Sequence, residues 1–97
     1  MPPQRKSGAN GSTKVTFSLP KDIRAEEASV CGDFNGWDPA VHPMKKYKDG
    51  HFAVSVDLPE GQYRYRFLLD GEKWENDWEA EEYAANPYGG EDSIIKV

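Results

Sequence analysis

Cysteine is nearly absent from this sequence of 97 residues, in which Cys31 is the only one. A single thiol cannot close an intramolecular disulfide, and no Cys-x-x-Cys pair or cysteine with a histidine at metal-ligand spacing is present. The sequence therefore excludes a disulfide-stapled scaffold and a zinc site built on cysteine. We expect Cys31 to be a structural residue, and a reducing compartment fits.

Excess positive charge and long apolar runs are also missing. Lys and Arg number 12 against 17 Asp and Glu, so the formal net charge is −5. An acidic chain lacks the general electrostatic attraction to nucleic acid and anionic membranes, and neither partner is expected. No apolar run approaches the roughly 18 residues of a membrane span, and the N-terminus lacks the apolar stretch of a secretory signal. We expect a soluble, cytoplasmic protein of one domain.

Signatures of catalysis are absent as well. The sequence has no Gly-x-Ser-x-Gly motif and no phosphate-binding loop, and His42 and His51 lie in segments of different character. Carboxylates are plentiful, but a glycosidase needs two of them about 5–10 Å apart in a cleft around the scissile bond. A domain of this size has little room for such a cleft. The sequence therefore predicts no catalytic residue, no metal and no cofactor.

What is present is a polar N-terminal segment followed by strand patterns. Residues 1–13 are rich in Pro, Gly, Ser and Asn and predict a flexible tail, whereas 14–97 are expected to form the folded module. Alternating apolar and polar residues indicate strands with one buried face. The segments that show this pattern, or are compatible with a strand, are 15–19, 28–34, 51–58, 62–71, 72–78 and 93–97.

Short strands joined by turns, with no sustained 3.6-residue apolar period, predict an all-β protein with an antiparallel β-sandwich. Segment 79–85, "EAEEYAA", is the one compatible with a helical turn. Along 62–69 the aromatic residues alternate with Arg64, Arg66 and Leu68, which are expected to face outward. The residues expected in the core are Phe17, Phe52, Val54, Val56, Tyr65 and Phe67.

One tryptophan stands among residues that favour tight turns, in "DFNGWDP" at 33–39. Asp, Asn, Gly and Pro promote turns through self-capping side chains, positive φ or a preset φ. Trp37 is therefore expected on a loop, where its ring either folds back onto the core or offers its face to a ligand.

The outward residues together resemble a sugar-binding surface. Arg66 lies on an outward strand face, and Trp74 follows the turn at Asp70 and Gly71. A sugar ring has apolar C–H faces and a rim of hydroxyls, so a site for it needs aromatic planes and polar rim groups. Core packing is the competing interpretation for each tryptophan, and Trp78 is expected to support the fold.

Three motifs in this order resemble the family-48 carbohydrate-binding modules: "VCGDFNGWDP", "LPEGQYRYRFLLDGEKW" and "NPYGGEDSIIKV". That family includes the glycogen-binding domain of the AMP-activated protein kinase β subunit and N-terminal domains of branching and debranching enzymes. The similarity runs from about Lys14 to Val97. It implies an immunoglobulin-like β-sandwich, a single domain that binds α-1,4-linked glucans such as glycogen and starch and performs no catalysis.

Carried over by position, the resemblance implies stacking tryptophans at Trp37 and Trp74 and a basic contact at Arg66. The family's late polar contact, typically asparagine, falls on Asp92, and this departure removes an amide donor and places a charge beside the sugar hydroxyls. The segment "NPYGG" resembles the corresponding segment of the modules attached to family-13 glycoside hydrolases. This resemblance implies that Tyr88 either packs against the site or braces the loop.

A second function from another class stays open. Some members of the resembled family act as docking or stability domains with little sugar affinity, and Trp and Arg are also enriched in protein interfaces. The same surface then binds a protein, and the resemblance implies a family-13 glycoside hydrolase or a kinase as partner. Binding of an α-glucan oligosaccharide or polysaccharide is the function that we expect from the sequence.

Overall fold

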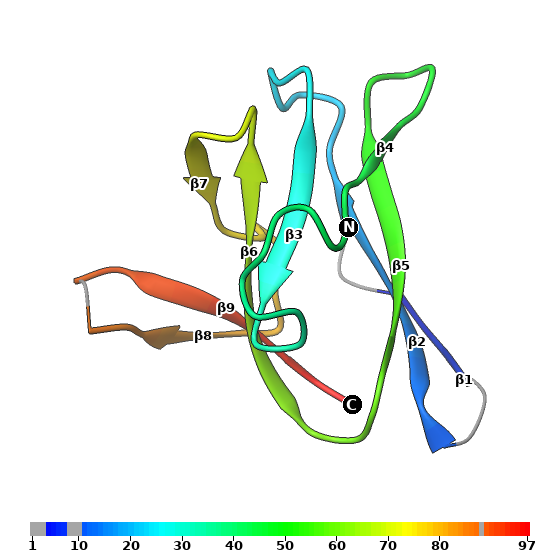
Figure 1. The fold of residues 1–97 in the computed structure, drawn as a ribbon, viewed down its shortest axis with the longest axis vertical. Coiled ribbons are helices and arrows are strands. Elements are labelled where there is room, and N and C mark those ends of the chain that lie inside the picture. Colours follow the sequence, from blue (N-terminus) through cyan, green and yellow to red (C-terminus); the bar gives the residue numbers. More distant parts are fainter. Residues whose placement is uncertain (1–3, 8–10, 88) are drawn as a thin grey trace.

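The computed structural model describes residues 4–7, 11–87 and 89–97, which form nine strands in two antiparallel sheets (Figure 1). The first sheet has the order β1-β2-β5-β4, and the second has the order β3-β6-β9-β8, with β7 also paired to β6. The prediction of an all-β antiparallel sandwich is confirmed. The strands are β1 (Gln4–Ser7), β2 (Thr13–Leu19), β3 (Ala28–Gly32), β4 (Lys45–Lys46), β5 (Phe52–Leu58), β6 (Gln62–Leu69), β7 (Lys73–Glu75), β8 (Glu82–Ala85) and β9 (Glu91–Lys96).

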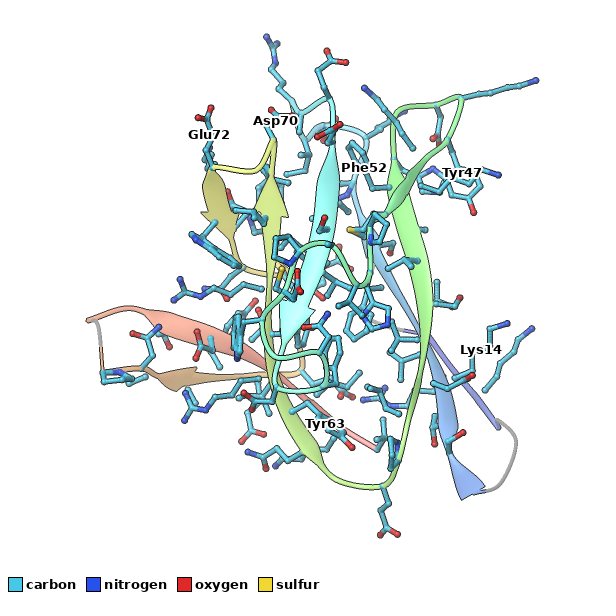
Figure 2. The ribbon with its side chains drawn as sticks, viewed as in Figure 1. Lys14, Tyr47, Phe52, Tyr63, Asp70 and Glu72 are labelled. Carbon is cyan, nitrogen blue, oxygen red and sulfur yellow. The ribbon has the colours of Figure 1, made fainter. Side chains whose placement is uncertain are left out.

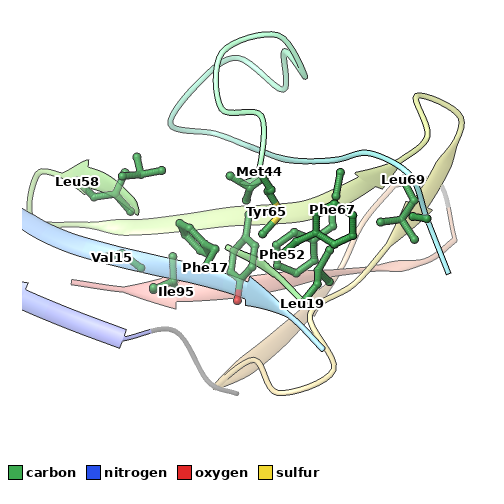
Figure 3. Packing of buried hydrophobic residues seen from close by; sticks show 14 residues of the cluster. Val15, Phe17, Leu19, Met44, Phe52, Leu58, Tyr65, Phe67, Leu69 and Ile95 are labelled. Carbon is green, nitrogen blue, oxygen red and sulfur yellow. The ribbon is translucent and has the colours of Figure 1, made fainter. Parts of the chain in front are cut away.

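The core lies between the sheets and is built on aromatic rings (Figure 3). Phe17 of β2 packs against Tyr65 of β6 with ring centroids 4.8 Å apart, so the two sheets meet ring to ring. Five of the six predicted core residues are buried, and Val54 is the exception. Val54 is partly buried and packs against the cluster.

The turn at Asp70 and Gly71 forms as the sequence predicts. Both residues have positive φ, 53° and 70°, and they connect β6 to β7. Figure 2 shows Asp70 and Glu72 at this end of the sheet. The Asp70 carboxylate accepts the backbone N–H groups of Glu26 and Glu27 at 2.8 and 3.0 Å, so the turn is tied to the chain that enters β3.

One local prediction is corrected. Segment 79–85 contains an edge strand, β8, and no helical turn, because its backbone pairs with β9. Leu68 lies on the outward face of β6 as predicted, but it is only 7% exposed. Trp74 of β7 lies directly opposite Leu68, and opposite residues share one face of the sheet. Within the described part of the chain, no helix is long and apolar enough to cross a membrane.

Four residues of the N-terminal segment form the edge strand of the first sheet. Of the predicted tail 1–13, residues 1–3 and 8–10 lie outside the described residues, whereas Gln4–Ser7 form β1, antiparallel to β2. The Arg5 guanidinium donates to the carboxylate of Glu81 and, at 3.2 Å, to the carbonyl of Lys96. The flexibility of residues 1–13 and the domain boundary at residue 14 stay predictions. Amide hydrogen exchange along this segment tests both.

Candidate functional site

An open groove of about 650 Å³ lies on the outer face of the second sheet. Arg64 and Arg66 reach this face because they alternate along β6 with Tyr65, which is fully buried in the core. Of the predicted site residues, the groove brings together Trp37, Arg66, Trp74 and Asp92, and Tyr88 lies outside the described residues. The full described lining is Asp33, Trp37, Arg64, Arg66, Trp74, Asn86, Pro87, Gly90 and Asp92.

The loop that carries Trp37 is held by the side chain of Asn35. Its Oδ1 accepts the backbone N–H groups of Gly32 at 3.0 Å and Trp37 at 3.1 Å. Its Nδ2 donates to the carbonyl of Val30 at 3.0 Å and lies 2.9 Å from His42 Nδ1. A side chain that satisfies several backbone groups replaces the hydrogen bonds of a regular strand, so the turn is rigid without being part of the sheet.

Trp37 itself has a left-handed backbone, with φ of 61°. This conformation is uncommon for a residue other than glycine, and it persists only where the surroundings enforce it. Here the indole Nε1–H donates to Asp33 Oδ1 at 3.1 Å, and Asp33 Oδ2 accepts the backbone N–H of Arg64 at 3.1 Å. Asp33 therefore ties the indole to β6, and the ring is oriented toward the groove before any ligand binds.

Trp74 approaches the same groove from β7. Its ring centroid lies 6.2 Å from that of Trp37, and the two ring planes are inclined by 63°, an edge-to-face arrangement. Trp37 is half-buried, whereas Trp74 is 45% exposed. Two indoles from distant parts of the sequence thus lie side by side along the groove, with their planes inclined to each other.

Trp78 contradicts the expectation that it supports the fold. It is 58% exposed and lies outside the buried core cluster. Its indole Nε1–H donates to Glu75 Oε1 at 3.0 Å. Trp78 also does not line the groove. Its ring can therefore be removed with little effect on the core, which makes it a control for the other two tryptophans.

The polar wall of the groove consists of two arginines, one buried carboxylate and the amide of Asn86. Arg66 Nε lies 2.9 Å from Asp92 Oδ1, and Arg64 Nη1 lies 3.2 Å from Asp92 Oδ2. Arg66 also donates to the carbonyl of Glu91, from Nε at 3.1 Å and from Nη2 at 2.5 Å. Asn86 Nδ2 donates to Asp92 Oδ1 at 3.2 Å. Asp92 is only 7% exposed, so its carboxylate lies behind the guanidinium groups.

Sequence reasoning missed two residues of this wall. Arg64 was assigned to the outward face of its strand but to no role, although it is two residues from Arg66 and so shares its face. Asn86 is in the "NPYGG" segment, and its side chain binds both Asp92 and the backbone N–H of Gly90, the latter at 3.1 Å. Strand alternation does not identify Asn86, because it lies in the turn between β8 and β9, which brings its side chain to Asp92 six residues later.

A buried polar network supports the sheet on its core side. Tyr65 donates its hydroxyl to Asp77 Oδ2 at 2.8 Å, and Ser93 Oγ accepts the backbone N–H of Asp77 at 2.9 Å. Burial raises the pKa of the Asp77 carboxyl above its ordinary value, although hydrogen bonds from Glu79 N–H and Tyr65 oppose the rise. Burial, with the charge of Asp77, also raises the pKa of Tyr65. This network fixes the chain between β7 and β8.

Cys31 of β3 lies opposite Arg66 of β6, so it is on the groove side of the sheet, where it is fully buried. Burial, aided by the charge of Asp38, raises the pKa of its thiol to about 11. A thiol with this pKa is protonated at neutral pH and behaves as a small apolar group. Among the described residues, no group of three or more His, Cys, Asp or Glu side chains is arranged to hold a metal ion.

The groove therefore combines two aromatic faces with guanidinium donors, an arrangement that suits a ligand with apolar faces and a rim of oxygen atoms. Comparison with known proteins points in the same direction. Residues 13–97 match the family model described as the glycogen recognition site of AMP-activated protein kinase. The resemblance to the family-48 carbohydrate-binding modules is thereby confirmed.

Three relatives illustrate the range of proteins that contain a similar segment. The mouse 5'-AMP-activated protein kinase subunit beta-2 is 36% identical over 52 residues, which cover 54% of this chain and 18% of the relative. The chloroplastic protein PTST homolog 2 of Arabidopsis thaliana is 38% identical over 62 residues, covering 64% and 11%. The 1,4-alpha-glucan branching enzyme GlgB 2 of Xanthomonas campestris is 36% identical over 45 residues, covering 46% and 6%. The chain thus matches less than a fifth of the length of each.

Proposed function

Because the chain belongs to the glycogen-recognition family of AMP-activated protein kinase, a family of carbohydrate-binding modules, we propose that it binds α-1,4-linked glucan in the groove without catalysis. In this proposal Trp37 and Trp74 stack on glucosyl rings, and Arg66 donates hydrogen bonds to their hydroxyls. The observation that carries the proposal is the meeting of both indoles, 6.2 Å apart, beside a guanidinium group at one groove.

The angle between the rings supports an α-glucan rather than a flat β-linked chain. The α-1,4 linkage curves the glucan, so successive sugar faces are inclined to one another, whereas a β-1,4 chain is an extended ribbon. Indole planes inclined by 63° offer two differently oriented faces, which match a curved chain. A flat ribbon places its faces in one plane and contacts only one of these rings well.

The hydrogen bonds of the Trp37 loop support tight recognition. The Trp37 backbone is held by Asn35, and its indole is held by Asp33. A side chain that is already ordered loses little entropy on binding, so more of the contact energy appears as affinity. Trp74 is a strand residue and is likewise positioned by backbone pairing, with Leu68 opposite it.

An amide-shift titration tests the proposal, because the three indole N–H signals report separately on three positions. We expect maltoheptaose to shift the indole signals of Trp37 and Trp74 and to leave that of Trp78 unchanged. Cellohexaose, the linear β-linked control, is expected to shift them far less. No shift of either groove indole at millimolar maltoheptaose overturns the proposal.

The alternative is a docking or stability domain with little sugar affinity. The observation that favours it is the short span of each match, since the kinase subunit and the branching enzyme are much longer proteins. In this alternative the exposed Trp74 and its neighbours contact a kinase or a family-13 glycoside hydrolase. The same titration separates the two, because a docking surface gives no response to maltoheptaose.

A further inference from the structure

We propose that Asp92 is a positioning residue that holds two arginines in the groove, and that Arg64 is a second guanidinium that binds the glucan. This inference deepens the proposed function and rests on it. It differs from the expectation drawn from the sequence, in which Asp92 meets the sugar hydroxyls itself and Arg64 has no role.

The first support is the position of the Asp92 carboxylate. Both of its oxygens are engaged: Oδ1 with Arg66 Nε at 2.9 Å and Asn86 Nδ2 at 3.2 Å, and Oδ2 with Arg64 Nη1 at 3.2 Å. Its side chain is 10% exposed, against 23% for Arg66 and 39% for Arg64. The guanidinium groups therefore lie between the carboxylate and the groove, where a ligand meets them first.

The second support is the topology that brings these groups together. Arg64 and Arg66 project from the same face of β6, and Asp92 projects from the same face of the neighbouring strand β9. Arg64 is paired in register with Ile94, two residues along β9 from Asp92. One carboxylate at this diagonal position can reach both arginines, whereas a residue on the opposite face of β9 reaches neither.

Charge explains why the carboxylate has to be present. Two guanidinium groups side by side repel, and a buried carboxylate without partners is costly, so each side of the cluster stabilises the other. Asparagine at this position has one oxygen acceptor and an NH₂ group. The NH₂ group turns a donor toward an arginine donor, so one arginine is released from its position.

The third support is the supply of hydrogen-bond donors. A guanidinium has five N–H donors. Among the described residues, Arg64 uses Nη1 for Asp92 and for the carbonyl of Ala85 at 3.3 Å, and Arg66 uses Nε and Nη2. Arg64 Nη2 and Arg66 Nη1 are not used in these contacts, and both arginines line the groove. Sugar hydroxyl oxygens are the acceptors that fit such a donor-rich wall.

The decisive experiment is a calorimetric titration of Asp92→Asn with maltoheptaose. The result that decides is whether affinity rises or falls relative to the wild type. If Asp92 contacts sugar directly, asparagine restores the family's amide and affinity rises. If Asp92 positions the arginines, affinity falls. We expect a five- to tenfold loss, and a rise or no change overturns the proposal.

A variant cycle separates positioning from direct contact. Arg64→Gln alone is expected to weaken binding about fivefold, the equivalent of roughly 1 kcal/mol for one hydrogen bond exchanged with water. If Asp92 acts through Arg64, the double variant loses less than the product of the two single losses. Fully multiplicative losses overturn the positioning role, and Arg64→Gln without effect overturns the binding role. Arg24→Gln is the matched control, because Arg24 is exposed and does not line the groove.

Two further readouts extend the test. The first needs no glucan, and the second does not depend on whether Asp92→Asn folds stably. The NMR signal of Arg66 Nε–H is expected to exchange slowly with solvent in the wild type and faster in Asp92→Asn, without any sugar; equal rates overturn the positioning role. In Gly90→Ala the new Cβ lies 3.0 Å from Arg66 Nη2, so the guanidinium has to shift by a few tenths of an ångström while Asp92 is kept, and affinity is expected to fall. A wild type that gives no heat with maltoheptaose overturns the proposed function and the binding role of Arg64, whereas the exchange rates still decide the role of Asp92.

Discussion

Replacing Trp74 by alanine is expected to weaken glucan binding by at least tenfold. Trp74 is 45% exposed, so of a side chain with a surface of roughly 250 Å² about 110 Å² faces solvent in the free protein. A glucosyl ring covers one face, about half of that area, and ~25 cal/mol per Å² gives ~1.4 kcal/mol, a tenfold change in affinity.

A second contribution comes from Trp37. The edge-to-face contact between the two indoles, with centroids 6.2 Å apart, is lost in the variant. Such aromatic pairs contribute about 0.5–1.5 kcal/mol beyond their buried area. Part of this energy holds the Trp37 ring in its bound orientation, so we expect a further loss of a few fold in affinity.

The assay is calorimetric titration with maltoheptaose at matched folded fraction, and the control is Trp78→Ala. Trp74 is half-covered, so its replacement is expected to lower the thermal midpoint by a few degrees, the response of a small domain to about 1 kcal/mol. Trp78 is 58% exposed and lies outside the groove. Trp78→Ala is therefore expected to lower the thermal midpoint by no more than Trp74→Ala does, and to leave the affinity for maltoheptaose unchanged. Equal affinity losses in both variants refute the reasoning, as does wild-type affinity in Trp74→Ala.

Two further predictions concern buried titratable groups. Because burial raises the folded-state pKa of Asp77, its contribution to stability is present below the ordinary carboxyl pKa of about 4 and is lost as pH rises through the folded-state value. The stability of the wild type relative to Asp77→Asn is therefore expected to fall from pH 4 upward in urea titrations, and a relative rise contradicts this. Cys31, with a pKa of about 11, is expected to react far more slowly with iodoacetamide in the native protein at pH 8 than in urea, since roughly one thiol in a thousand is ionised and the residue is fully buried. Equal rates refute the structural role.

The strands and most of the core were predictable from the sequence, because alternation is a local property of the chain. Phe17, Phe52 and Tyr65 stand at alternating positions, and a strand turns every second side chain to one face. The turn at Asp70 and Gly71 was predictable for a similar reason, since both residues have positive φ and Asp-Gly is a residue pair that tolerates this conformation in turns. The short strand β8 was not, because it has no buried face and forms only through its pairing with β9.

The candidate site was predictable only in part. The turn residues around Trp37 indicated a constrained loop, and alternation placed Arg66 outside the core. Whether Trp74 and Trp78 are exposed could not be derived from their neighbours in the sequence, and the expectation for Trp78 was wrong. The exposure of an aromatic ring depends on what packs over it, which is decided by distant segments.

The sequence by itself therefore determined the fold class, the outward placement of Arg66 and the turn at Trp37, all of which depend on residues a few positions apart. Only the tertiary structure decided that the two indoles meet and that Asp92 lies behind Arg64 and Arg66. Arg64 and Asp92 are 28 residues apart and become neighbours only through the pairing of β6 with β9. Which strands pair is settled by how the whole core is buried, so the partners of a charged side chain follow from the packing of the complete domain.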